Sequence, residues 1–143
     1  FPAIFIALKD ATGAIARVSI QRELCGPEFA QLSGNDETAL GFMASGGCGC
    51  ISVTANVVPR LCADFQDACR RQDYRRALDL QDRLSPLHRA LFVEPSPSPL
   101  KYAMSKVRSG YGAVTRLPLV EIGANSKIVM DAALNRALRK CLA

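Results

Sequence analysis

The sequence predicts an α/β fold, and two observations lead to this prediction. Three short apolar segments recur about every 20–25 residues, and each is followed by a loop and an amphipathic stretch, which is the βαβαβα order of a parallel sheet. These segments are apolar without alternation, as strands covered by helices on both faces are. With 143 residues, of which 49% are hydrophobic, the chain is long and apolar enough to form a sizeable core.

Glycine-containing turns separate the three expected strand and helix pairs. Gly26 and Pro27 form the exit signal of the first helix, and the pair Gly46-Gly47 closes the second. The strands are expected at about residues 4–8, 29–32 and 48–53, and the helices that follow them at about residues 15–24, at about residues 37–44 and from Pro59 onward.

From about residue 58 onward the sequence is helical. Asp73 is expected to cap the second of these helices, and Pro86 is expected to kink it. Ser98 and Pro99 are a cap and first-turn pair for a helix that runs to about Val107. The last predicted helix is amphipathic, with an apolar stripe at Met130, Leu134, Leu138 and Cys141.

Charge, cysteine content and hydropathy argue against several classes of protein. The net charge is +5, but the basic pairs lie at expected helix ends without interleaved aromatic residues, which favours a solvated surface over nucleic-acid binding. Apolar runs of about six residues are too short to cross a bilayer and no leader is visible, so we expect a cytoplasmic protein without a membrane partner. The six cysteines lack framework spacing and one histidine leaves few metal ligands, so we expect buried reduced thiols and no metal. The cysteines are Cys25, Cys48, Cys50, Cys62, Cys69 and Cys141.

Polar side chains cluster directly after the three predicted strands. Because parallel strands end at the same edge of a sheet, where α/β proteins bind their ligands, we expect these clusters to meet at one face. Lys9 is the only lysine among them. The clusters are Lys9, Asp10 and Thr12; Ser33, Asn35 and Asp36; and Thr54 and Asn56.

Lys9, at the end of an apolar strand, suits one particular chemistry. A free lysine with a pKa of about 10.4 is neutral in about one molecule in 2,500 at pH 7, so it attacks a carbonyl only with help from its surroundings. Burial favours the neutral amine, and a lysine in such a setting can form a Schiff base. The alternative is a structural lysine that extends into solvent or pairs with Asp10, and the local pattern leaves both open.

Three other patterns have structural explanations. Ser98 and Lys101 match the S-x-x-K of penicillin-binding enzymes, but the companion motifs are absent and helix capping explains Ser98. The glycines around Cys48 lead into a strand rather than a helix, so they predict a turn and not a phosphate-binding loop. His88 lies on a helical stripe without a carboxylate or thiol around it, so we expect a packing residue.

Longer stretches of the sequence add a family resemblance. It is carried by the segments ALKDATGAIARVSIQREL, LSGNDETALGFMASGGCGCISVTANVVPRL, PLHRALFVEPSPSPLKYAM and RLPLVEI. In register and over essentially the whole chain, they resemble the carboxyl-terminal half of the dihydrodipicolinate synthase family of lysine-dependent pyruvate aldolases. The synthase branch of the family is favoured over the sialate and keto-sugar-acid lyases by the segment ISVTAN and the later segment FVEPSPSPLK.

The resemblance implies a partial (β/α)8 TIM barrel, with the last three βα units at residues 1–72 and a C-terminal helical domain at residues 73–143. It implies that Lys9 is the catalytic Schiff-base lysine that captures pyruvate, and that Gly34 and Ile51 line the pocket around the imine. The reaction of the family condenses pyruvate with aspartate semialdehyde in lysine biosynthesis, and it requires no metal or organic cofactor.

Departures from the family leave alternatives open. Asn35, Ser96, Ser98 and Tyr102 differ from the usual residues of the family, so a pyruvate-dependent class I aldolase of the sialate or keto-sugar-acid lyase type remains an alternative. The first five strands of the barrel are not in this sequence. We therefore expect the chain alone to be inactive, with the missing amino-terminal half or self-association as its partner, and a homo-oligomer, tetrameric in the complete family. A non-catalytic truncated remnant that serves as an interaction module is the other alternative.

Overall fold

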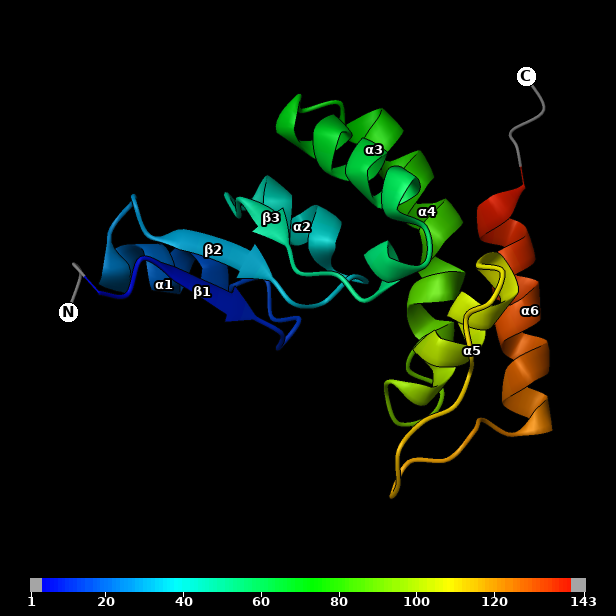
Figure 1. Cartoon of the computed structure of the whole chain (residues 1–143). Coiled ribbons are helices and arrows are strands. Elements are labelled where there is room, and N and C mark those ends of the chain that lie inside the picture. Colours follow the sequence, from blue (N-terminus) through cyan, green and yellow to red (C-terminus); the bar gives the residue numbers. More distant parts are fainter. Residues whose placement is uncertain (1–3, 140–143) are drawn as a thin grey trace. The chain divides into compact units, whose positions relative to one another are not determined.

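Residues 4–139, the part of the chain that the computed structural model describes, form three strands and six helices (Figure 1). The predicted order of three strand and helix pairs followed by further helices is confirmed. The strands are β1 (Ala7–Asp10), β2 (Ala30–Ser33) and β3 (Gly49–Cys50). The helices are α1 (Arg17–Cys25), α2 (Ala39–Ala44), α3 (Pro59–Arg70), α4 (Tyr74–Ala90), α5 (Ser98–Val107) and α6 (Ala124–Leu138), with a 3-10 turn, η1 (Thr54–Asn56), before α3.

The three strands form one parallel sheet in the order β1-β2-β3. Lys9 pairs with Leu32 and Asp10 with Ser33, and Leu32 pairs in turn with Gly49. The parallel arrangement predicted from the sequence is confirmed, and it brings the carboxyl ends of all three strands to one edge. Strands β1 and β3 are shorter than expected, with four and two residues, while β2 has the expected length of four.

The strands are also less buried than the sequence predicts. Ile4, Phe5 and Ile6 are 66–71% exposed, and three of the four residues of β1 are exposed. In β2 every second residue is buried, and the amide Nε2 of Gln31 donates to the carbonyl of Val18 in α1 at 3.0 Å. The prediction of helices on both faces is therefore wrong for this chain, because α1 lies on one face of β1 and β2, while on the other face Lys9 is exposed and Leu32 is half-buried.

Most helix boundaries follow their predicted signals. Helix α1 ends at Cys25, and the Gly26 that follows has a positive φ of 91°, which glycine adopts without strain. Helix α3 begins at Pro59 as predicted. The carboxylate of Asp73 caps α4 by accepting the backbone N–H of Arg76 at 3.0 Å. Pro86 lies inside α4, which continues to Ala90, so it does not end the helix.

Two predictions about α5 and α6 are wrong. Ser98 is not the cap of α5, because Pro97 holds that position and Ser98 is already helical, with a buried side chain. Leu138 is 51% exposed, whereas Met130 and Leu134 are buried as predicted. The helical period of 3.6 residues places position 137 rather than 138 on this stripe, and Ala137 is fully buried. Cys141, the last predicted member of the stripe, lies outside the described residues.

The thiols and the buried histidine match their predictions in part. Cys62 and Cys69 are buried and Cys25 and Cys48 are exposed, so burial was predicted correctly for only some of the thiols. None of the five described cysteines is in a disulfide. His88 is a buried packing residue as predicted, with Nδ1 2.7 Å from Thr54 Oγ1. Among residues 4–139, no three His, Cys, Asp or Glu side chains gather as metal ligands, and no helix has the length and hydropathy of a membrane span.

The chain divides into two compact units, and α3 and α4 contribute to both. The first contains the sheet, α1, α2 and residues 63–81. The second contains η1, α5, α6 and the remaining parts of α3 and α4, from residues 53–62 and from residue 82 onward. The domain boundary predicted between residues 72 and 73 stays a prediction. Buried apolar residues of the first unit include Val18, Phe42, Phe65 and Leu80, and those of the second include Leu84, Leu87, Leu91 and Met130.

Candidate active site

The three predicted site residues lie on one face of the sheet, at its carboxyl edge. The strand register places Lys9, Leu32 and Gly49 in one row across the sheet. Side chains alternate between the two faces along a strand, so Gly34 and Ile51, two residues beyond Leu32 and Gly49, return to the face of Lys9. The structure thus brings Lys9, Gly34 and Ile51 together, and their roles in catalysis and binding stay predictions.

Main-chain hydrogen bonds extend the sheet to Gly34 and Ile51. The N–H of Gly34 donates to the carbonyl of Asp10 at 2.7 Å, and the N–H of Ile51 donates to the carbonyl of Ser33 at 2.8 Å. A methyl group on Gly34 would lie 2.7 Å from Cε of Lys9 and 2.8 Å from Cβ of Ala11. Only glycine at this position therefore leaves room for the side chain of Lys9.

Lys9 itself is exposed, and its amine makes no hydrogen bond or ion pair with any residue that the structure describes. The expectation of a buried strand end is wrong for this residue, because β1 has β2 as its one neighbour among the described strands and α1 lies on the opposite face. The alternative of a Lys9–Asp10 ion pair is also wrong. The amine is therefore free to meet a ligand on the open face.

Asp10, the next residue, is 7% exposed and faces α1. Its Oδ1 accepts the N–H of Thr12 at 2.9 Å and the hydroxyl of Thr12 at 2.6 Å, and its Oδ2 accepts Nε of Arg17 and Nε2 of Gln21, both at 2.7 Å. The hydroxyl hydrogen bond from Thr12 is the main cause that lowers the pKa of Asp10 well below its ordinary value of 3.8, against the opposing effect of burial.

The sequence did not predict this hydrogen-bond network, and Asp10 was expected among the residues at the ligand-binding face. A signal was present, because an Asp two residues before a Thr often forms a local side-chain turn. The contributions of Arg17 and Gln21 depend on α1 folding back over the sheet, and no local pattern indicates them.

The polar residues after β2 hold their own loop together. The hydroxyl of Ser33 accepts the N–H of Asn35 at 3.1 Å, and Oδ1 of Asn35 accepts the N–H of Thr38 at 3.2 Å. Nε2 of Gln81, in α4, donates to the carbonyls of Asp36 at 3.3 Å and Glu37 at 3.1 Å. These contacts fix the loop that carries Gly34, so this predicted cluster has a structural role in the described chain.

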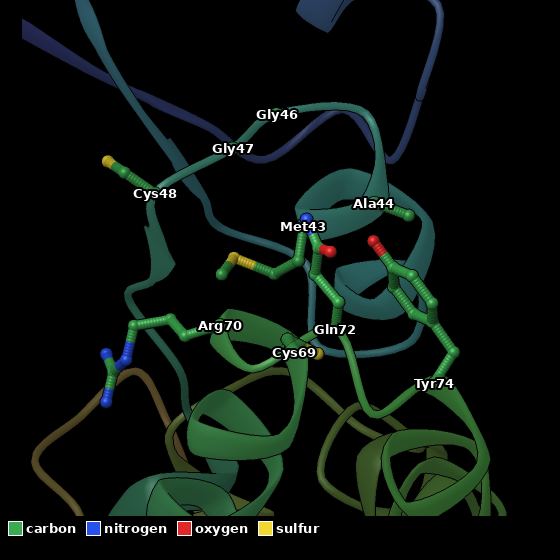
Figure 2. A pocket seen from close by; sticks show the side chains of 9 residues that line it. All are labelled: Met43, Ala44, Gly46, Gly47, Cys48, Cys69, Arg70, Gln72 and Tyr74. Atoms are coloured by element: carbon green, nitrogen blue, oxygen red, sulfur yellow. The ribbon is translucent and has the colours of Figure 1, made fainter.

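A hollow of about 430 Å³ lies before β3, at the amino-terminal side of that strand (Figure 2). Figure 2 shows the thiol of Cys48 and the guanidinium of Arg70 directed away from the amide of Gln72 and the hydroxyl of Tyr74, so its polar groups do not converge on one ligand. Its lining residues are Met43, Ala44, Gly46, Gly47, Cys48, Cys69, Arg70, Gln72 and Tyr74, and none of the predicted site residues is among them.

The glycine turn beside this hollow has no amides left for a phosphate. The N–H groups of Gly46, Gly47 and Cys48 donate to the carbonyls of Met43, Phe42 and Gln31 at 3.1, 3.0 and 2.9 Å. A methyl group on Gly47 would lie 2.2 Å from the Phe42 ring, so the glycine serves close packing. The prediction of a turn rather than a phosphate-binding loop is confirmed.

The profile of the Dihydrodipicolinate synthetase family matches residues 3–137 of this chain. The chain belongs to the dihydrodipicolinate synthetase family. The resemblance drawn from the sequence is therefore confirmed, as is the α/β class of the part of the fold that the structure describes.

Individual relatives agree with this assignment. The 4-hydroxy-tetrahydrodipicolinate synthase of Zymomonas mobilis subsp. mobilis is 59% identical over 136 residues, which are 95% of this chain and 46% of the relative. The crystal structure of dihydrodipicolinate synthase from Aquifex aeolicus superimposes with a TM-score of 0.84 at 32% identity, over 92% of this chain and 44% of that one. The crystal structure of the chloride-inhibited dihydrodipicolinate synthase from Acinetobacter baumannii, complexed with pyruvate, gives a TM-score of 0.80 at 32% identity. The match covers 90% of this chain and 44% of that one. The chain spans less than half the length of these relatives.

Proposed function

We propose that this chain supplies the lysine nucleophile of a Schiff-base lyase that condenses pyruvate with aspartate semialdehyde in lysine biosynthesis. The observation that carries the proposal is the free, exposed amine of Lys9 on the open face of the sheet, beside Gly34 at the carboxyl edge. Family membership supports it, as do the names of the relatives and the pyruvate complex of the Acinetobacter baumannii enzyme.

The proposed chemistry uses the lysine as a covalent electron sink. The amine of Lys9 attacks C2 of pyruvate, the carbinolamine loses water, and an imine forms. Loss of a proton from C3 gives an enamine, which attacks the aldehyde carbon of aspartate semialdehyde and forms the new carbon–carbon bond. Cyclisation by the amino group of the second substrate then displaces Lys9, which leaves as the free amine. No metal or organic cofactor takes part in this sequence.

The two neighbours of Lys9 have distinct proposed roles at the imine. Gly34 leaves space for Cε of Lys9, since a methyl group there would lie 2.7 Å away. Ile51, whose side chain is 48% exposed, offers an apolar wall on the same face of the sheet. An apolar wall beside an imine excludes water that would hydrolyse it.

The same proposal extends to the architecture. We infer that β1, β2 and β3 with their helices are the last three units of a (β/α)8 barrel, and that the later helices form a C-terminal helical domain. The exposed apolar residues Ile4, Phe5 and Ile6 would then be covered by the part of the barrel that the relatives have and this chain does not. The complete enzyme, meaning this chain joined to that part, would be a cytoplasmic homo-oligomer.

Borohydride trapping in the complete enzyme tests the proposal. Reduction in the presence of pyruvate should leave a stable three-carbon adduct on the peptide that contains Lys9. The variant Lys9→Arg keeps the charge and should give no adduct. The control is Lys127→Arg, at a lysine of α6 that forms an ion pair with Glu121, and it should react like the wild type. An adduct on a different lysine would contradict the assignment of Lys9, and no adduct at all would favour the non-catalytic alternative.

Substrate preference separates the branches of the family. With pyruvate present, the complete enzyme should consume aspartate semialdehyde faster than it cleaves sialic acid or 2-keto-3-deoxy sugar acids. A preference for a sugar acid would overturn the synthase assignment and leave the Schiff-base chemistry in place.

A further inference from the structure

The reactive amine of Lys9 lacks an anchor of its own in the described chain. It makes no hydrogen bond or ion pair, and its side chain has four rotatable bonds. An amine that attacks a carbonyl must be held close to its reacting geometry, because a misplacement of about 1 Å can cost roughly 100-fold in rate. Within the described chain, the main chain around Lys9 is therefore what positions it.

Asp10 fixes that main chain from the covered side of the sheet. Both oxygens of its carboxylate accept two hydrogen bonds each, at 2.6–2.9 Å, from Thr12, Arg17 and Gln21. With all four bonds in place the side chain has one orientation. The end of β1 is thereby tied to the loop that follows it and to α1.

The main chain of Asp10 makes a second connection, toward β2. Its carbonyl accepts the N–H of Gly34 at 2.7 Å. The Cα of Gly34 in turn faces Cε of Lys9, where a methyl group would be 2.7 Å away. Asp10 thus links α1, through β1, to Gly34, which borders the side chain of Lys9.

We propose that Asp10 is a positioning residue for Lys9, holding the end of β1 between α1 and Gly34 so that the amine projects from the open face in one direction. This inference rests on the proposed Schiff-base function. It adds a residue that does not touch the substrate and acts through the backbone and through Gly34. A purely structural Asp10 would affect thermal stability and leave the reactivity of Lys9 unchanged.

The test is the rate of imine formation in Asp10→Asn, followed by borohydride trapping at timed intervals in the complete enzyme. The substitution keeps the size of the side chain but replaces an acceptor oxygen with an NH₂ group that faces donors. At saturating pyruvate, and well below the melting temperature, we expect trapping to slow by about tenfold or more. The half-saturating pyruvate concentration should change little, because Asp10 does not contact the substrate.

The matched control is Asp131→Asn, which makes the same chemical change in α6. That carboxylate accepts the hydroxyl of Tyr102 at 3.1 Å and has no part in the site, so trapping should keep its wild-type rate. If Asp10→Asn folds and traps pyruvate as fast as the wild type, the inference is overturned while the proposed function stands. If the wild type forms no adduct, the proposed function itself fails.

A second variant covers the case in which Asp10→Asn does not fold. Thr12→Val keeps the carboxylate and removes the hydroxyl that donates to it at 2.6 Å, together with the exposed bond that this hydroxyl accepts from the N–H of Ala14 at 3.2 Å. A folded Thr12→Val with slower trapping supports the inference, and one with the wild-type rate contradicts it.

Discussion

The two faces of the sheet differ most at the end of β1, where Lys9 and Asp10 are adjacent in sequence. Asp10, on the face covered by α1, is 7% exposed and accepts four hydrogen bonds, whereas Lys9, on the open face, makes none within the described chain. Buried polar groups must be paired inside the protein, while an unpaired group on an open face is available to a ligand. The end of β1 thus carries a hydrogen-bonded, buried carboxylate at Asp10 and an exposed amine at Lys9 that is available to a ligand.

The largest expected effect concerns the chain alone. Strands β1 and β3 are the edge strands of the described sheet, and the segment before β1 exposes the apolar side chains of Ile4, Phe5 and Ile6. Unpaired strand edges tend to pair with other chains. We expect the 143-residue chain to be inactive toward pyruvate and stable in solution only as an assembly. Light scattering with intact mass spectrometry checks this, and a monodisperse 15.4 kDa monomer would contradict it.

Substitution of Lys9, on the open face, should change turnover strongly and stability little. In the complete enzyme, Lys9→Ala should lower turnover by about 10³-fold or more, because the nucleophile is lost. Its effect on the free energy of unfolding should stay within about 0.5 kcal/mol, because the side chain is exposed and unbonded. Steady-state kinetics and thermal melts measure both quantities. A large loss of stability would show that Lys9 belongs to the structural face after all.

Gly34→Ala tests the close approach between the two strands. The new methyl group would meet Cε of Lys9 at 2.7 Å and Cβ of Ala11 at 2.8 Å, so the lysine must move. We expect the rate of pyruvate trapping to fall by about tenfold to 100-fold. Gly112→Ala is the matched control, because a methyl group there meets nothing within 4 Å. Equal rates in both variants would remove Gly34 from the site.

The smallest expected effect is on how the free energy of unfolding depends on pH, through Asp10 on the face covered by α1. The pKa of Asp10 is lowered in the folded chain, first by Thr12, so its stabilisation is fully present above the ordinary value of 3.8 and is lost as the pH falls below it. Asp10→Asn should lower the free energy of unfolding at pH 7 by about 2 kcal/mol. The difference from the wild type should shrink as the pH falls below 3.8. Denaturant titrations at pH 7 and pH 3 check this, and a difference independent of pH would contradict it.

Local patterns in the sequence were sufficient for the order of the elements and for the edge of the sheet at which the candidate site residues lie. Turn signals such as Gly26, the cap at Asp73 and the start of α3 at Pro59 act over a few residues, so they could be identified directly. The shared face of Lys9, Gly34 and Ile51 follows from parallel strands and side-chain alternation.

Features that depend on distant parts of the chain could not be predicted in the same way. The exposure of Lys9 and Ile4 depends on which elements pack on each face of the sheet. An apolar strand sequence does not show whether such an element is present. The bonds from Arg17 and Gln21 to Asp10 require α1 to fold over the sheet. The error at Ser98 is local instead, because α5 begins with Ser98 rather than after it.

A crystal structure of the complete enzyme with pyruvate tests most directly whether the open face is the reactive one. We predict continuous electron density from Nζ of Lys9 to C2 of pyruvate, with Gly34 and Ile51 beside it on the same face of the sheet and the carboxylate of Asp10 still bonded to Thr12, Arg17 and Gln21. Pyruvate bound elsewhere, for example in the hollow lined by Arg70 and Tyr74 in Figure 2, with Lys9 unmodified, would contradict it.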